Sequence, residues 1–478
     1  MPAVSIPLEA SQTVRPDLTT KLILRLYVPL ALSWVFMALE SPSITAIIGR
    51  MPDKVLNSAA LLVMMSMSLW IESPVIDLLS TATTLAKDQQ RNIELRRYVI
   101  LLIAWVTFAH ALFVLTPIYY FVTLRMLSLP REVAEHARVG LYLMIPWSGF
   151  IGWRRYLQGI LIRFHRTRLI SVGTFVRICT ISTVGWSLFF FSHLPPMVIA
   201  ASALVSSVGA ESIFIHFASK GTLLREFGEA VPADSVTDDD GFAPSEIVDS
   251  AILDTSIPDV APANGPITMR KLMAFHLPLT ATTMVALVGT PMISAALAQS
   301  SDPKLSLASW QVVVTLVWLC RTIEFALPEV IITLYKDAQS AAKLRFFSIS
   351  VGLIIAGAMA LAAFSGADRL FFSKVLGEDP PTVAMAHLAF LCAITLPLIG
   401  SQQNYIKGML TAHHLTTARF MSSLVSFLTL MSMLILCVRL GLPGVVNAGI
   451  SLNVALLCEV LVLFTFWRRG VKRLGIRL

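Results

Sequence analysis

The segment Thr84-Leu85-Ala86-Lys87-Asp88-Gln89-Gln90 decides how this chain is organised, because it recurs 249 residues later (84 + 249 = 333) as Thr333-Leu334-Tyr335-Lys336-Asp337-Ala338-Gln339. The same offset places Pro29-Leu30 on Pro278-Leu279 and Pro42 on Pro291, and no gap is needed between residues 29 and 100. Apolar helices often match one another by chance, whereas a Lys-Asp-x-Gln motif and paired prolines do not. The sequence therefore predicts two copies of one structural unit.

The composition around this repeat is that of a membrane protein. Of 478 residues, 56% are hydrophobic and only 14% are charged, and the mean hydropathy is +0.74. These values exclude a soluble multidomain protein, since soluble chains carry about 25% charged residues. No alternating strand pattern indicates a β-barrel. The five cysteines lie in apolar runs without paired spacing, so we expect neither disulfides nor a metal site.

Apolar runs of the length needed to cross a bilayer, about 20 residues, predict an all-α polytopic protein with twelve transmembrane helices. The expected spans are 22–49, 56–86, 98–124, 137–162, 169–192, 196–219, 272–298, 306–335, 346–366, 383–406, 418–438 and 443–467. They divide the chain into a cytoplasmic arm (1–21), a six-helix bundle (22–219), an acidic cytoplasmic linker (220–267), a second six-helix bundle (268–467) and a basic tail (468–478). The linker stretch 221–265 contains ten acidic residues and a single arginine, which is typical of a solvated connector or of a partner-binding segment.

The distribution of Lys and Arg predicts the orientation. With both termini inside, the inner segments hold 26 of these residues and the outer loops hold 9. Since positive charge accumulates on the cytoplasmic side, we expect a multi-pass protein of the cell membrane with both termini cytoplasmic.

An even number of spans in each copy makes the two halves parallel repeats, related by an axis along the membrane normal. Two such bundles around a central cleft form the architecture of a secondary transporter that works by rocking. The loop at residues 87–91 lacks the glycines typical of major-facilitator transporters.

Four short motifs carry a resemblance to a known family: Val28-Pro29-Leu30, Leu277-Pro278-Leu279 after Arg270-Lys271, Pro74-x-x-Asp77 and Gly159-Ile160-Leu161. The chain resembles the multidrug/oligosaccharidyl-lipid/polysaccharide exporter superfamily, which includes the MATE transporters, and within it the progressive ankylosis protein family. The pair Arg154-Arg155 departs from that family's pattern. The resemblance implies export of polyanionic metabolites such as citrate, pyrophosphate or nucleotides.

Charged residues inside the spans are candidate site residues, because a charge at the bilayer centre costs roughly 2.5–3.5 kcal/mol. We expect unneutralised guanidinium groups to bind an anionic substrate bidentately, helped by polar residues at repeat-equivalent positions. The substrate-binding candidates are Arg154, Arg155, Arg177, Arg321, Gln403 and Asn404. The alternative for Arg154 and Arg155 is that they anchor the helix at the membrane interface.

Carboxylates in the spans are candidates for ion coupling or gating, because a buried acid can cycle protons or bind a cation. These candidates are Glu40, Glu72, Asp77, Glu211 and Glu324. Since 72 + 249 = 321, Glu72 and Arg321 are expected to meet across the cleft; the alternative is a local Arg321–Glu324 pair. Pro42 and Pro291 are expected to break the first and seventh spans.

The leading function is a secondary exporter of small organic or phosphate-bearing anions. The alternatives are MATE-like efflux of cationic drugs and flipping of anionic lipid-linked substrates. The sequence contains no Walker, His-Glu-x-x-His or nucleophile-elbow motif, so we expect no enzyme activity. We expect no cofactor apart from H⁺ or Na⁺ as a coupling ion, membrane lipids but no nucleic acid as partners, and a monomer.

Overall fold

The computed structural model describes residues 18–164, 166–228, 268–413 and 417–473, and every regular element in these ranges is helical. The helices of the first half are α1 (Thr20–Ala38), α2 (Glu40–Ile48), α3 (Lys54–Ile71), α4 (Ser73–Ile76), α5 (Leu78–Leu85), α6 (Gln89–Leu115), α7 (Ile118–Tyr120), η1 (Phe121–Met126), α8 (Arg131–Leu143), α9 (Trp147–Arg163), α10 (Thr167–Phe191) and α11 (Pro196–Phe227). Those of the second half are α13 (Met269–Ala298), α14 (Pro303–Arg321), η3 (Thr322–Ala326), α15 (Leu327–Leu334), α16 (Ala338–Ser365), α17 (Ala367–Leu370), η4 (Phe371–Val375), α18 (Pro380–Ala393), α19 (Leu396–Ala412), α20 (Thr417–Arg439) and α21 (Gly444–Arg473). The all-α fold class is confirmed.

The two halves repeat the same local features. The α6 and α16 helices both start behind an aspartate N-cap, Asp88 and Asp337, whose side chain accepts a hydrogen bond from a backbone amide of the first turn. The π-helical turns η1 and η4 follow at corresponding places. The α3 and α14 helices stop at equivalent points, before Glu72 and after Arg321.

Most of the expected spans are present as long apolar helices. Within the described ranges, ten helices are long and apolar enough to cross a membrane, and α18 with α19, bent by 42°, makes an eleventh. The remaining expected span corresponds to α8 and α9, two shorter helices of 13 and 17 residues that carry several charged side chains. Many large apolar side chains of α6, α10 and α16 are exposed, among them Trp105, Phe175 and Phe364. This is expected for helices that face lipid chains, which contain no water.

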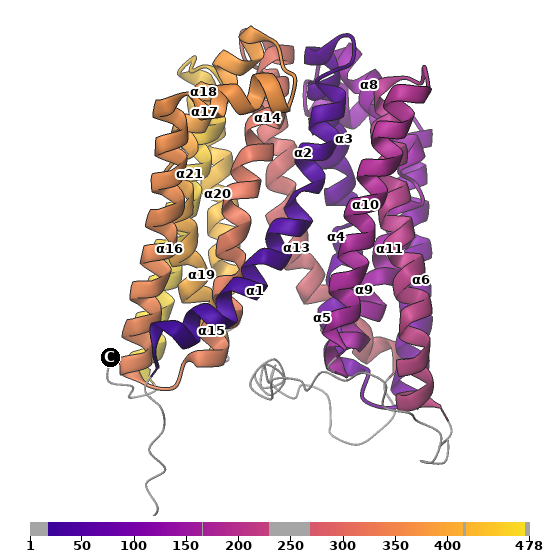
Figure 1. Cartoon of the computed structure of the whole chain (residues 1–478), viewed down its shortest axis with the longest axis vertical. Coiled ribbons are helices and arrows are strands. Elements are labelled where there is room, and N and C mark those ends of the chain that lie inside the picture. Colours follow the sequence, from indigo (N-terminus) through magenta and orange to yellow (C-terminus); the bar gives the residue numbers. More distant parts are fainter. Residues whose placement is uncertain (1–17, 165, 229–267, 414–416, 474–478) are drawn as a thin grey trace, which may run out of the picture.

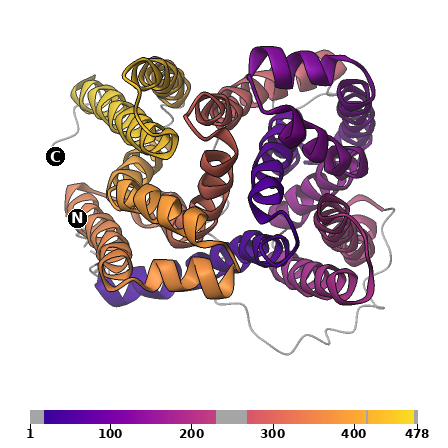
Figure 2. The same cartoon turned by 90° about the horizontal axis from the view of Figure 1, so that it is seen from above.

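The two halves approach each other at one end of the molecule and diverge toward the other (Figure 1). We call the first the closed end; it contains the turns at 49–53, 127–130, 299–302 and 376–379. The other is the splayed end. Seen along the long axis, the halves lie side by side (Figure 2). Next to the closed end, α2 and α14 are joined through hydroxyl groups, since Thr315 Oγ1 lies 3.2 Å from both Ser41 Oγ and Thr45 Oγ1.

The first helix of each half leans across to the opposite half toward the splayed end. On α1, the Tyr27 hydroxyl donates to Ile323 O (2.8 Å), and its ring meets Phe347 edge-on. On α13, His276 Nε2 lies 2.8 Å from Pro74 O, and its ring meets Tyr98 edge-on. Adding 249 to 27, 74 and 98 gives 276, 323 and 347, so the two contacts are symmetry equivalents. The proposed bundle boundaries stay a prediction, but α1 and α13 each contact both halves.

The structure corrects one of the two expected helix breaks. The first span breaks at Leu39, and Pro42 occupies the first turn of α2, where a missing backbone donor costs nothing. The α13 helix instead continues through both Pro278 and Pro291. The N-terminal arm up to residue 17, most of the acidic linker and the last five residues lie outside the described ranges.

Candidate functional site

An ionic network lies inside the first half, between α2, α9, α10 and α11. Arg154 donates to Glu211, and Gln158 Nε2 donates to the other carboxylate oxygen of Glu211 at 3.2 Å. Arg177 donates to Glu40, and its Nη1 lies 3.7 Å from Glu211 Oε2. Arg154 is 4% exposed and Glu211 is fully buried. Burial of such charges requires pairing, and here two guanidinium groups and two carboxylates neutralise one another.

Helix spacing and one glycine position this network. Arg154 and Gln158 are one turn apart on α9, so both face Glu211 on α11. Gly173 brings α10 close to α11: a Cβ atom there would lie 2.9 Å from Ile215 Cδ1 and 3.4 Å from Glu211 Cγ. Arg177 follows Gly173 by one turn and therefore reaches the same carboxylate.

Arg155 differs from its neighbours because it has no counter-ion. Within the described part of the chain, its side chain forms no ion pair and no hydrogen bond, and its buried Nε lacks a partner. The residue is partly exposed, unlike Arg154 beside it. It interacts electrostatically with Glu72 and Asp77 without contacting them. This guanidinium therefore forms no hydrogen bond with the described residues that an external anion would have to displace, and its exposed part can bind one.

Glu72 and Asp77 occupy the two breaks of the second span. Glu72 lies between α3 and α4, and Asp77 lies between α4 and α5. Each carboxylate keeps one buried oxygen without a hydrogen-bond partner, and neither forms an ion pair among the residues described. Discontinuous membrane helices commonly line ion and substrate sites, because unpaired backbone groups need polar surroundings.

The second half contains a smaller ionic site at its own helix break. Arg321 Nε donates to Glu324 Oε1 at 2.7 Å, where α14 passes into η3. Gly400 on α19 leaves the space for this pair, since a Cβ atom there would lie 2.5 Å from Glu324 Oε1 and 2.8 Å from Arg321 Nη2. Asn404 Nδ2 donates to Glu324 O at 3.2 Å, and Gln403 is buried nearby on the same helix.

A third ionic site is the pair of Lys407 on α19 with Glu459 on α21, whose Nζ and Oε1 lie 2.9 Å apart. We did not predict this pair from the sequence. The repeat register contained a signal for it, because 158 + 249 = 407, so Lys407 corresponds to Gln158, which contacts Glu211. Each half therefore places one acid of its last helix against a residue of its fourth span.

Comparisons with known proteins identify the fold. No family model matches the sequence, and no curated protein does. Solved structures do match over nearly the whole chain. An inward-facing conformation of a multidrug resistance MATE family transporter of the MOP superfamily has a TM-score of 0.67 at 11% identity, covering 94% of this chain and 98% of that one. This chain has the MATE transporter fold.

Two other solved structures with this fold are similar. An outward-facing conformation of a multidrug resistance MATE family transporter has a TM-score of 0.61 at 13% identity, covering 96% of this chain and 97% of its own. A MOP superfamily transporter from Pyrococcus furiosus has the same TM-score and identity, covering 96% and 100%. Its binding pocket is described as having reverse polarity, which suggests a different function. The resemblance to the progressive ankylosis family stays a prediction.

Within the MATE fold, the expected pairing of Glu72 with Arg321 is not formed. Arg321 pairs with Glu324 as the local alternative predicts, because three residues along a helical turn bring the two side chains together. Glu72 lies in the first half, close to Arg154, Arg155 and Arg177 in electrostatic terms.

The expectation of four unneutralised guanidinium groups is also corrected. Arg154, Arg177 and Arg321 all pair with carboxylates, and these are three of the acids expected to couple ions: Glu211, Glu40 and Glu324. A buried arginine without a partner is too costly to keep, so the acids act as counter-ions. Only Arg155 retains the predicted free state.

Proposed function

We propose that this chain is a secondary transporter that exports small organic or phosphate-bearing anions by alternating access of its two halves. Support for the movement comes from the duplicated architecture and from the MATE fold, for which inward-facing and outward-facing structures are both solved. Parallel six-helix repeats that meet at one end can rock about that contact and open the other.

The substrate class rests on one observation, the unpaired and partly exposed Arg155 beside an otherwise neutralised network. A guanidinium fork matches the geometry of carboxylate and phosphate oxygens, and its affinity for them increases in a site of low dielectric constant. Glu211 and Glu40 are occupied by Arg154 and Arg177, and no carboxylate among the described residues contacts Arg155, so an anion binding there displaces no ion pair. Anionic substrates also agree with the resemblance to the progressive ankylosis family.

We assign the closed end to the outside and the splayed end to the cytoplasm of the cell membrane. Lys and Arg are concentrated in the loops of the splayed end, as expected for a cytoplasmic face. The structure is then in an inward-facing state, in agreement with the higher TM-score to the inward-facing MATE transporter (0.67 against 0.61).

We assign ion coupling by H⁺ or Na⁺ to Glu72 and Asp77. The other three acidic candidates neutralise arginines, whereas these two form no ion pair in the parts of the chain that are described. The positive charge of Arg155 stabilises the ionised forms of Glu72 and Asp77. An anion bound to Arg155 would neutralise that charge and so favour binding of a cation or proton by these two carboxylates.

A second candidate is MATE-like efflux of cationic compounds. Four carboxylates (Glu40, Glu72, Asp77 and Glu211) face three guanidinium groups in the first half, so the region is slightly acidic when all are ionised. The solved MATE transporters of the same fold are described as multidrug resistance proteins. This alternative predicts that a cation binds between Glu72 and Asp77.

Transport into proteoliposomes distinguishes the two candidates. Vesicles containing the full chain are given labelled citrate, labelled pyrophosphate or a cationic dye. We expect anion uptake in the wild type and a roughly 10- to 150-fold weaker apparent affinity in Arg155→Met, since a hydrogen bond to a charged group contributes about 1.5–3 kcal/mol. Arg155→Lys keeps the charge but not the fork, and should fall between them.

The matched control is Arg163→Gln on the same helix. Arg163 Nη1 donates to Thr83 O at 2.9 Å, near the splayed end of α9, so its replacement should leave anion affinity within about twofold of wild type. Dye accumulation that depends on Glu72 and Asp77, together with no anion uptake, would refute the anion assignment and support the second candidate.

A further inference from the structure

Two polar clasps hold the halves together at the closed end. In the first clasp, Lys54 Nζ donates to Gly377 O and to Asp379 Oδ1, both at 3.0 Å, and Arg50 donates to the carbonyls of Lys374 and Val375 at 2.9 and 2.8 Å. The segment 374–379 belongs to the second half, and both cations belong to the first.

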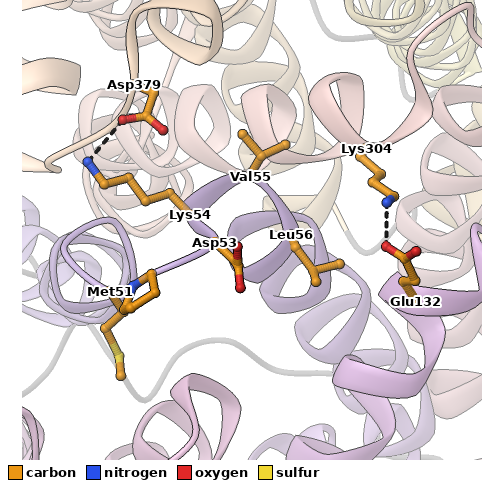
Figure 3. Close-up of a pocket in the computed structure, with 9 residues that line it drawn as sticks. Met51, Asp53, Lys54, Val55, Leu56, Glu132, Lys304 and Asp379 are labelled. Carbon is orange, nitrogen blue, oxygen red and sulfur yellow. Dashed lines mark hydrogen bonds and ion pairs between the residues drawn. The ribbon is translucent and has the colours of Figure 1, made fainter.

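In the second clasp the cation lies on the second half and the acid on the first, because Lys304 pairs with Glu132. The repeat register relates the two clasps, because 54 + 249 = 303 is next to Lys304. They border one shallow pocket of about 470 Å³, and Figure 3 shows both ion pairs at its edges. The side chains of both ion pairs are about one third to two thirds exposed, so each pair contributes little by itself.

Glu378 is the one acid of the first clasp that is enclosed by both halves. It is 5% exposed, and its Oε1 accepts a hydrogen bond from Ser58 Oγ of α3 at 2.8 Å. Its Oε2 is buried without a partner. Gly49 lies against it, since a Cβ atom there would be 3.2 Å from Oε1. The carboxyl group thus loses its water when the first half packs over segment 374–379.

The charged groups around Glu378 do not neutralise it. Lys54 acts on Glu378 electrostatically, but its ammonium is already bonded to Asp379 and Gly377. Asp379, next in the chain, adds negative charge, and the guanidinium of Arg50 is directed at backbone carbonyls. Glu378 lies outside the membrane-spanning segments, and burial raises the pKa of its carboxyl group from an ordinary value of 4.5 to about 7.

We propose that Glu378 is a proton-binding site of the first clasp, which takes up a proton when the halves close over it and releases the proton when they part. The neutral carboxyl can donate to Ser58 Oγ, whereas the carboxylate is a buried charge without a counter-ion. Outside protons then favour the inward-facing state. This inference rests on the proposed alternating-access movement but not on the identity of the substrate.

The direction of the pH effect follows from the two states. In the open state Glu378 faces water and titrates near its ordinary pKa, while in the closed state its pKa is about 7. The extra stability that protonated Glu378 gives the closed state is therefore fully present below the open-state pKa of Glu378. It is lost as pH rises through the closed-state pKa of about 7. The closed-to-open ratio should fall by roughly two orders of magnitude across this window.

The experiment measures the distance between the halves at the closed end in lipid nanodiscs. Spin labels are attached through unnatural amino acids at Met126 of the first half and Leu370 of the second, both exposed. We expect a growing long-distance population in the full-length wild type as pH rises from about 5 to about 8. In Glu378→Gln the clasp stays closed and the titration disappears. Asp379→Asn, the matched control, opens more at every pH but keeps the titration.

Each outcome decides a different point. If Glu378→Gln titrates like the wild type, the proton site is wrong. An Arg50→Ala/Lys54→Ala variant removes the first clasp and tests the movement itself. If this variant opens while the wild type ignores pH, the proton site fails and alternating access stands. If Arg50→Ala/Lys54→Ala keeps the short distance between the two spin labels, as the wild type does, the proposed movement fails. The infrared difference spectrum between the wild type and Glu378→Gln should contain the band of one protonated carboxyl, which verifies the group in a folded protein.

Discussion

Glu211→Gln is the substitution that tests the buried network most directly. Glu211 is the counter-ion of Arg154, lies 3.7 Å from the guanidinium of Arg177 and accepts a hydrogen bond from Gln158. The amide keeps the shape of the side chain but removes its charge. Breaking a buried pair by removing one partner costs about 3–5 kcal/mol, because the remaining charge is left without compensation. We expect a loss of stability in that range.

A double variant separates the cost of an unpaired charge from the value of the pair. Arg154→Met with Glu211→Leu removes both charges and leaves the Arg177–Glu40 pair in place. Replacing a buried ion pair by apolar residues is often neutral or stabilising by about 1–4 kcal/mol. The double variant should therefore be markedly more stable than Glu211→Gln alone.

The assay is thermal and denaturant unfolding of all variants in one detergent and one lipid mixture. Glu135→Gln is the matched control, since Glu135 pairs with Arg131 on the surface, where the two side chains are 44% and 80% exposed. Its effect should stay below about 1 kcal/mol. The reasoning is refuted if Glu211→Gln behaves like this control, or if the double variant is less stable than the single one.

Substitutions at four further positions test local features. Gly159→Ala should destabilise the protein by about 1–3 kcal/mol, because its Cβ would lie 2.5 Å from Leu79 O. Gly357→Ala, with no atom within 4 Å of its Cβ, should stabilise the protein by about 0.5–1 kcal/mol in the same unfolding assay. Tyr27→Phe should cost about 0.5–1.5 kcal/mol through its lost hydrogen bond to Ile323 O; an unchanged unfolding midpoint would contradict the cross-half contact. Asp337→Ala should lower the unfolding midpoint, because it removes the N-cap of α16, and Asp337→Asn should not. Hydrogen bonds from Ser340 lower the pKa of Asp337. The loss in Asp337→Ala relative to the wild type is therefore present above the ordinary pKa of Asp337 and disappears as acid protonates that carboxylate.

The fold class was predictable because two strong patterns agree in this sequence. Hydropathy predicts membrane helices, and the 249-residue offset predicts that they come in two equivalent sets. The helix breaks were predictable only in part. Pro42 and Pro291 occupy equivalent positions, yet only the first span breaks, because the effect of a proline depends on where the helix around it begins.

The candidate site was predictable in residue type but not in pairing. Arg321 and Glu324 are three residues apart, so a spacing rule predicts their contact. Arg154 and Glu211 are 57 positions apart, and the Arg177–Glu40 contact spans 137 positions. No local rule relates residues at such separations, since tertiary packing alone decides which acid faces which cation. Three of the four arginines that appear free in the sequence are therefore neutralised in the fold.

The duplicated scaffold carries charges that are not duplicated, and this asymmetry has a mechanistic consequence. Glu211 and Glu459 are neutralised within their own halves, the latter by Lys407, so neither half offers a net charge from these pairs. Of the four candidate arginines, only Arg155 forms no ion pair with the described residues, and its repeat equivalent is the neutral Asn404, since 155 + 249 = 404. An anion held by Arg155 is therefore bound to the first half alone. If the halves rock as rigid bodies, the substrate moves with the first half, and the second half changes which side of the membrane the site faces.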